Sequence, residues 1–151
     1  ANEAEQKAAW QQIKLEEQTA KGQTKRYLDD VKASLSSLGV AKNLQAKAAK
    51  VGFDWSEPEP IIAKIEEELN EVKDEIIAND KAKLQKEIGD LLFAVVNLAR
   101  HYDIDPDVAI TETNVKFKQR FHYIETHLGK PMTEASLTEM DYWWERAKKD
   151  E

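Results

Sequence analysis

Apolar side chains recur every three to four positions along most of the chain, which is the period of an α-helix. Gly, Pro, Asn and Asp residues interrupt this pattern and mark the ends of the periodic segments. We therefore expect helices over residues 3–20, 38–51, 58–78, 81–101, 106–128 and 137–149. No period-two alternation is present. Because the connections are short, the predicted fold class is all-α, an antiparallel helical bundle.

Local signals support the predicted helix ends. Ser56 with Glu59, and Ser136 with Glu139, follow the S-x-x-E pattern that predicts a capping box at a helix start. Gly52 is placed to end the helix before it, as glycine commonly does. By contrast, the segment 3–20 has good helix formers but few apolar residues, which indicates that its helix needs a partner.

Composition narrows the classes of function. The 151 residues carry a net charge of −7, which repels nucleic-acid backbones and anionic membranes. The chain contains no cysteine, no apolar run of the ~20 residues that a membrane span needs, and no signal-peptide core in its first residues. We therefore expect no nucleic-acid partner, no membrane association and a reducing, cytoplasmic environment.

The predicted helix 58–78 combines an apolar stripe with a row of acids. At ~100° per residue, one face carries Ile62, Ile65, Leu69, Val72 and Ile76. Glu68, Glu71 and Glu75 flank this stripe, and Glu67 lies further round the helix. These glutamates alone fit two interpretations, a solvated acidic face or a set of metal ligands, and the pattern does not decide between them.

The next predicted helix repeats this arrangement. Residues 88–99 are apolar on nearly every side, which predicts that the segment is buried on most sides, yet Asp90 lies within it and Glu87 just before it. Lys83 and Asn97 share their face. An isolated buried carboxylate is costly, gathered carboxylates repel one another, and a divalent cation removes both penalties. Ligands that offer only oxygen suit Mg²⁺ or Mn²⁺ rather than zinc.

These residues resemble a known family. Glu67-Glu68-Leu69-Asn70-Glu71 followed by Glu87-Ile88-Gly89-Asp90 looks like the EExxE…ExxD signature of MazG-type nucleoside triphosphate pyrophosphohydrolases. Residues 51–55, 89–93 and 114–120 resemble the C-terminal domain of bacterial MazG, and residues 10–14 resemble the segment that links its two domains. The likeness covers roughly residues 27–149.

The resemblance implies Mg²⁺-dependent hydrolysis of nucleoside triphosphates to nucleoside monophosphate and pyrophosphate, with Mn²⁺ as an alternative metal, by a homodimer or larger assembly. It implies that residues 1–34 form an N-terminal helix with a linker-like segment and that residues 35–151 form the catalytic domain. By match to the motif, magnesium is held by Glu68, Glu71, Glu87 and Asp90. Glu67 supports them or orients water, and the cations that face phosphates are Lys83, Lys116 and Arg120.

Several of these residues have a second interpretation. Lys116 and Arg120 fit an exposed basic helix face, and Lys83 fits an i,i+4 ion pair with Glu87. Phe53 and Trp55 fit either base stacking or closure of the bundle end. Trp144 aligns with a family aromatic near the substrate, and Asn97 fits a ligand contact less well than a buried polar contact.

Two other functions remain open from the sequence. One is a helical dimerisation or nucleotide-sensing module that binds nucleotides without cleaving them. The other is a related phosphoribosyl-ATP or dUTP pyrophosphohydrolase. The sequence contains neither the Gly-x-x-x-x-Gly-Lys-[Ser/Thr] motif of a P-loop nor a Glu-x-x-His pair of the kind that di-iron bundles use.

Overall fold

The computed structural model describes residues 2–20, 26–32 and 36–151, with the backbone alone for residues 15–20. The chain divides into two compact units, Ala1–Asp103 and Ile104–Glu151, and each is described by itself. The described residues form helices and connecting turns without a β-strand, which confirms the predicted all-α class. None of the helices in these ranges is long and apolar enough to span a membrane.

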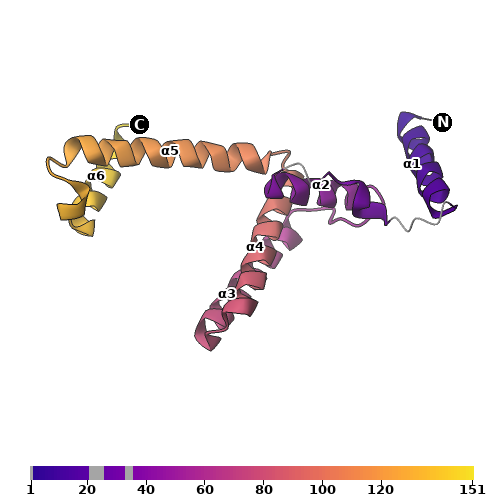
Figure 1. Cartoon of the computed structure of the whole chain (residues 1–151), viewed down its shortest axis with the longest axis horizontal. Helices are drawn as coiled ribbons and strands as arrows, with labels where there is room; N and C mark the ends of the chain where they lie inside the picture. The colour runs from indigo at the N-terminus through magenta and orange to yellow at the C-terminus, as the bar shows by residue number, and fades with distance from the viewer. Residues whose placement is uncertain (1, 21–25, 33–35) are drawn as a thin grey trace. The chain divides into compact units, whose positions relative to one another are not determined.

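The first unit contains α1 (Glu3–Ala20), the short 3-10 helix η1 (Tyr27–Asp30), α2 (Ser37–Ala49), α3 (Glu59–Ala78) and α4 (Lys81–His101) (Figure 1). The second contains α5 (Pro106–His127), the 3-10 helix η2 (Met132–Glu134) and α6 (Leu137–Lys149). All six predicted helices are therefore present, with ends that differ by two residues at most. The predicted linker-like segment up to residue 34 lies partly outside the described residues.

The predicted capping box of α3 is absent. Ser56 does not cap this helix, which instead begins after Pro58 without a side-chain cap. A helix capped by Ser56 would need the Pro60 nitrogen to donate to the Ser56 carbonyl, and proline has no N–H group. The first backbone bonds run instead from Ile61 and Ile62 to the Pro58 carbonyl, at 3.0 and 3.1 Å.

α3 and α4 pack side by side as an antiparallel hairpin (Figure 1). Asn79 ends α3 in the left-handed conformation, with φ of 55°, a geometry that asparagine tolerates better than most residues. Asp80 then begins α4, since its carboxylate accepts a hydrogen bond from the Lys83 backbone N–H at 3.1 Å. This tight connection fixes which residues of the two helices face each other.

The core of the first unit is small. Ile61, Ala94 and Val96 are buried, and α2 packs on α4, where the Gln45 amide donates to the Phe93 carbonyl at 2.9 Å. The prediction that residues 88–99 are buried on most sides is therefore wrong, because much of this segment is exposed, and part of the apolar stripe of α3 is exposed as well. The neighbouring helices cover only one side of each, which leaves exposed Ile62, Leu69, Ile76, Ile88, Leu92, Phe93 and Val95.

The second unit is a helical hairpin in which α5 packs on α6. Its buried side chains include Ile124 and Ala147, and aromatic rings line the contact, with Phe117 and Trp144 centred 5.5 Å apart. The predicted capping box is present at α6, where Ser136 and Glu139 bond each other's backbone N–H. The predicted start of α5 is also present, since Asp105 accepts from the Asp107 N–H at 2.9 Å ahead of the helix.

The left-handed turn at Asn79 predicts a specific response to substitution. We expect Asn79→Ala to lower the free energy of unfolding by about 1 kcal/mol, because a Cβ is disfavoured at positive φ and the asparagine side chain is lost. Asn79→Gly at the same site should leave stability within about 0.5 kcal/mol of the parent. Urea unfolding followed by circular dichroism measures both, and equal stability of the two variants would contradict the assignment.

Candidate metal centre and ligand pocket

Three carboxylates from two helices converge in the first unit. α3 supplies Glu68 and Glu71, which lie nearly one turn apart on the same face, and α4 supplies Glu87. One oxygen from each residue lies within 4.8 Å of the other two. The packing of α3 against α4 thus assembles the acidic group from residues far apart along the chain.

Glu68 is the most buried member, with 4% of its surface exposed. Its carboxylate pairs with Lys64, one turn earlier in α3, at 3.1 Å. Burial acts to raise the pKa of Glu68, but the hydrogen bond and positive charge of Lys64, together with hydrogen bonds to Glu87 and Glu71, outweigh it and lower that pKa. Glu68 therefore stays ionised, and Lys64 compensates only part of the negative charge of the three carboxylates.

Glu87 is the member that takes up a proton most readily. The neighbouring Glu71 carboxylate, together with burial and Glu68, raises the pKa of Glu87 to about 7. Among the described residues, none donates a hydrogen bond to Oε2 of Glu87 or to Oε2 of Glu68, although both atoms are buried. Buried carboxylate oxygens without a donor need either a proton or a cation nearby.

The three glutamates could therefore hold a metal ion. They offer only carboxylate oxygens, the ligands preferred by hard divalent cations. The two buried oxygens without donors fit this role, because a bound cation would satisfy both. Repulsion between the carboxylates, which raises the pKa of Glu87, would be relieved in the same way.

The other predicted acidic and basic residues of this unit lie around these three. Asp90 is exposed and lines the pocket beside Glu68, but it is not one of the three clustered carboxylates. Glu67 points to solvent and pairs with Lys64 at 3.5 Å. Lys83 is exposed in the first turn of α4, where its backbone N–H bonds Asp80.

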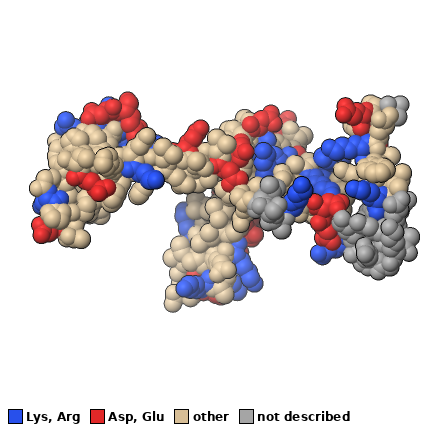
Figure 2. Space-filling view, turned by 45° about the horizontal axis from the view of Figure 1, so that its top comes forward, with Lys and Arg blue, Asp and Glu red and all other residues tan. Residues whose placement is uncertain are grey.

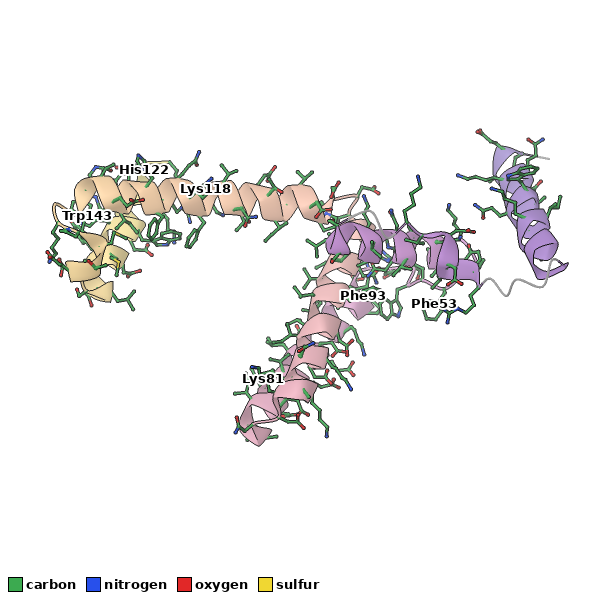
Figure 3. The ribbon with its side chains drawn as sticks, viewed as in Figure 1. Phe53, Lys81, Phe93, Lys118, His122 and Trp143 are labelled. Carbon is green, nitrogen blue, oxygen red and sulfur yellow. The ribbon has the colours of Figure 1, made fainter. Side chains whose placement is uncertain are left out.

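A pocket of about 720 Å³ adjoins Glu68 and Asp90, within the size range of small-ligand sites. α2, α4 and the loop that joins α2 to α3 supply most of its walls. Its lining is largely apolar and aromatic, and includes Leu28, Leu44, Ala48, Phe53, Trp55, Phe93 and Ala94. Figure 3 labels Phe53 and Phe93, which reach the pocket from the loop and from α4.

The predicted base-stacking residues lie in this wall. Phe53 is 82% exposed and Trp55 is 43% exposed, so neither is a plug of the hydrophobic core. Asn97 is buried at the pocket, where its Oδ1 accepts hydrogen bonds from Arg100 at 2.9 and 3.1 Å. The structure thus brings Phe53, Trp55 and Asn97 together with Glu68 and Asp90.

Sequence reasoning missed four polar residues that line this pocket: Gln45, Asp54, Lys64 and Arg100. Lys64 had a detectable signal, because a lysine four residues before Glu68 is placed to pair with it. The others had none, since their roles depend on contacts between segments far apart in the sequence. Gln45 also carries a buried oxygen, Oε1, that has no hydrogen-bond donor among the described residues.

The remaining predicted substrate-binding residues belong to the second unit. Arg120 makes a two-pronged ion pair with Glu151, at 2.6 and 2.9 Å. Its guanidinium also lies 5.2 Å from the ring centre of Trp144. Lys116 is exposed one turn earlier on α5. The structure therefore brings Arg120 and Trp144 together, and occupies Arg120 with a carboxylate.

Comparison with known families identifies the domain in which the acidic group lies. Residues 56–124, which include the three clustered glutamates and Asp90, match the MazG nucleotide pyrophosphohydrolase domain. The chain carries a domain of the MazG family, and the resemblance inferred from its acidic signature is confirmed.

Curated relatives match most of the chain. A nucleoside triphosphate pyrophosphohydrolase of Escherichia coli K12 is 41% identical over 155 aligned residues, which cover 99% of this chain and 59% of the relative. The nucleoside triphosphate pyrophosphohydrolase/pyrophosphatase MazG of Thermotoga maritima is 37% identical, over 92% of this chain and 54% of the relative. The chain therefore spans little more than half the length of these two relatives. YabN of Bacillus subtilis, an uncharacterised protein, is 48% identical over 45% of this chain and 14% of its own length.

The carboxylate cluster predicts an unusual titration. In metal-free protein the Glu87 carboxyl should titrate near pH 7, because Glu71 is the largest cause that raises its pKa. Glu71→Gln should move this midpoint down toward the ordinary value of 4.5, whereas Glu67→Gln should change it little, since Glu67 points to solvent. Carbon-detected NMR of the glutamate carboxyls measures the midpoints. A Glu87 midpoint near 4.5 in the parent protein would contradict the cluster.

Proposed function

We propose that this chain hydrolyses nucleoside triphosphates to nucleoside monophosphate and pyrophosphate in a reaction that depends on Mg²⁺. The observation that carries the proposal is the group of three glutamates, with two buried oxygens that lack donors, beside an aromatic pocket. Membership of the MazG family and the names of the E. coli and T. maritima relatives support the same activity.

Glu68, Glu71 and Glu87 would hold the metal, and Asp90, the fourth predicted ligand, lines the adjoining pocket together with Glu68. Mg²⁺ suits this all-oxygen set, and Mn²⁺ is the closest substitute. A bound divalent ion would neutralise phosphate charge and lower the pKa of a bound water. Glu87 would give up its proton as the cation binds, because ligands must be deprotonated.

The other predicted residues would bind and orient the substrate. Phe53 and Trp55 would pack against the base, with Asn97 as a polar contact at the same pocket. Lys83 would face phosphates in this unit. Lys116 and Arg120, in the second unit, stay predicted phosphate-binding residues, and Arg120 would offer a planar, two-pronged donor. Glu67, which already faces solvent, would orient water. Positioning and charge stabilisation are the main demands of phosphoryl chemistry.

The proposed activity is tested with a panel of nucleotides, with the products separated. We expect monophosphate and pyrophosphate from at least one nucleoside triphosphate when Mg²⁺ is present and none after chelation. Glu71→Gln should lower kcat by about 100-fold or more, because it removes a metal ligand. Glu66→Gln, at an exposed position on the same helix, is the matched control and should retain activity.

Folded protein that releases no pyrophosphate from any nucleotide, with any of several metals, would contradict the activity. The same panel includes dUTP and phosphoribosyl-ATP, so it also separates the proposed reaction from those of the related enzymes. Nucleotide binding without cleavage would support a nucleotide-sensing module instead. Thermal melting with and without Mg²⁺ tests the metal site independently, because a ligand of the folded state stabilises it by mass action.

We propose further that the chain assembles as a homodimer through the outer faces of α3 and α4. Monomeric proteins rarely expose large continuous apolar patches, yet these two helices expose Ile62, Leu69 and Ile76, and Ile88, Leu92 and Val95 respectively. In the view of Figure 2, the lower body formed by α3 and α4 presents a patch without charged residues, which Lys and Arg side chains border. A second copy would cover such faces symmetrically.

Light scattering coupled to size-exclusion chromatography tests this assembly. The parent chain should elute with about twice its mass of 17.3 kDa. Leu92→Glu should shift the mass toward that of one chain, because a charge cannot be buried in an apolar interface without a partner. Lys86→Glu, at an exposed polar position of α4, should leave the mass unchanged. A monomeric parent at micromolar concentration would contradict the dimer.

A further inference from the structure

The aromatic loop of the pocket is tied to α4 by one carboxylate oxygen. Oδ1 of Asp54 accepts a hydrogen bond from Nη2 of Arg100 at 2.6 Å and lies 2.9 Å from Nε2 of His101. It also accepts from the Trp55 backbone N–H at 2.8 Å. Asp54 therefore joins the loop between α2 and α3 to the last turn of α4.

Arg100 extends this link into the pocket. Its Nε and Nη2 donate to Oδ1 of Asn97 at 3.1 and 2.9 Å, so one guanidinium holds both the loop and the buried amide. The side chains of Arg100 and Asp54 are only 15% and 25% exposed, so water screens this ion pair less than the surface pairs that contribute little. The Arg100 guanidinium also lowers the pKa of Asp54, which keeps the carboxylate charged.

Burial alone cannot hold the loop in place. Phe53 is 82% exposed and Trp55 is 43% exposed, so their packing removes little apolar surface from water. Gly52 adopts a φ of +90°, a geometry that glycine enters at little cost and that imposes little restriction on the neighbouring residues. The Phe53 backbone N–H also donates to the Ala48 carbonyl at 3.1 Å, which ties the start of the loop to α2. Among the described residues, the hydrogen bonds that join the loop to α4 are those of Asp54, and the same carboxylate accepts the bond from the Trp55 N–H.

We propose that Arg100 and His101 are positioning residues for nucleobase binding: through Asp54 they hold Phe53 and Trp55 against the pocket, where the base stacks. This inference rests on the proposed function and extends it to three residues that the acidic motif does not include. Stacking on an aromatic side chain depends strongly on ring orientation, so loss of this link should weaken base binding. The carboxylates on α3 and α4 should be unaffected.

The first test separates base binding from chemistry. We expect Arg100→Met to raise KM for the preferred nucleoside triphosphate by about tenfold, the size of one lost base–aromatic stack, with kcat within about twofold. KM for the matching sugar triphosphate without a base should not change, because it has no ring for the loop to contact. Arg26→Met, at an exposed arginine of the same unit, is the matched control.

A second variant tests whether Arg100 acts through the loop. Asp54→Ala removes the other partner of the link, and Glu57→Ala is its control at an exposed position nearby. If both residues act through one link, the double variant Asp54→Ala/Arg100→Met should raise KM no more than either single change. Additive effects would mean that Arg100 contacts the nucleotide independently. Asp54→Ala also tests the proposal if Arg100→Met fails to fold.

A third measurement needs no catalysis. With 5-fluorotryptophan incorporated, the ¹⁹F resonance of Trp55 should shift or broaden in Arg100→Met without nucleotide, whereas that of Trp10 should not. An unchanged Trp55 signal would overturn the proposal, and so would an equal rise in KM for the base-containing and base-free triphosphates.

If the parent protein cleaves nothing, calorimetry with an uncleavable α,β-methylene triphosphate and the base-free triphosphate makes the same comparison. If nucleotide binds but is not cleaved, only the proposed reaction is contradicted. If no nucleotide binds, the proposed reaction and the positioning role of Arg100 and His101 are both overturned.

Discussion

Repulsion among Glu68, Glu71 and Glu87 is the constraint on which the rest of the site depends. Two helices bring these carboxylates within 4.8 Å of one another, although separation would relieve the repulsion. Apolar packing of α3 on α4 and the tight turn at Asn79–Asp80 hold them together. Lys64 compensates Glu68, and the repulsion that remains raises the pKa of Glu87 to about 7. The free energy of hairpin packing thus offsets the cost of gathering negative charge.

Apolar packing and a charged hydrogen-bond network together shape the aromatic pocket. Its apolar wall comes from α2 and α4, but its aromatic loop is positioned by a charged network that ends in Asp54. The two halves of the site meet where Glu68 and Asp90 line the same pocket as Phe53 and Trp55. A ligand with an anionic end and an aromatic end fits this division, and nucleotides have both. The geometry of α4 serves both halves, since Glu87, Asp90, Asn97 and Arg100 all project from it.

Much of the fold and part of the site could be predicted from the sequence, for identifiable physical reasons. Helix ends followed local chemistry, as at Asp80, Asp105 and Ser136, whose side chains bond nearby backbone groups. Ser56 failed because a proline four residues later cannot donate the bond that its capping box requires. Burial was harder to predict, because the periodicity of residues 88–99 shows that a surface is apolar but not what covers it. Contacts between distant segments, such as Asp54 with Arg100, leave no local pattern at all.

The connection between α3 and α4 also limits how the chain can vary. Glu71 and Glu87 are joined through two helices and a left-handed turn, so their meeting depends on the number of residues between them. One extra residue inside either helix would rotate everything beyond it by ~100° and carry one set of acids away from the other. Insertions and deletions between Glu71 and Glu87 should therefore abolish the acidic group. Helical geometry therefore fixes the number of residues between the two acidic motifs.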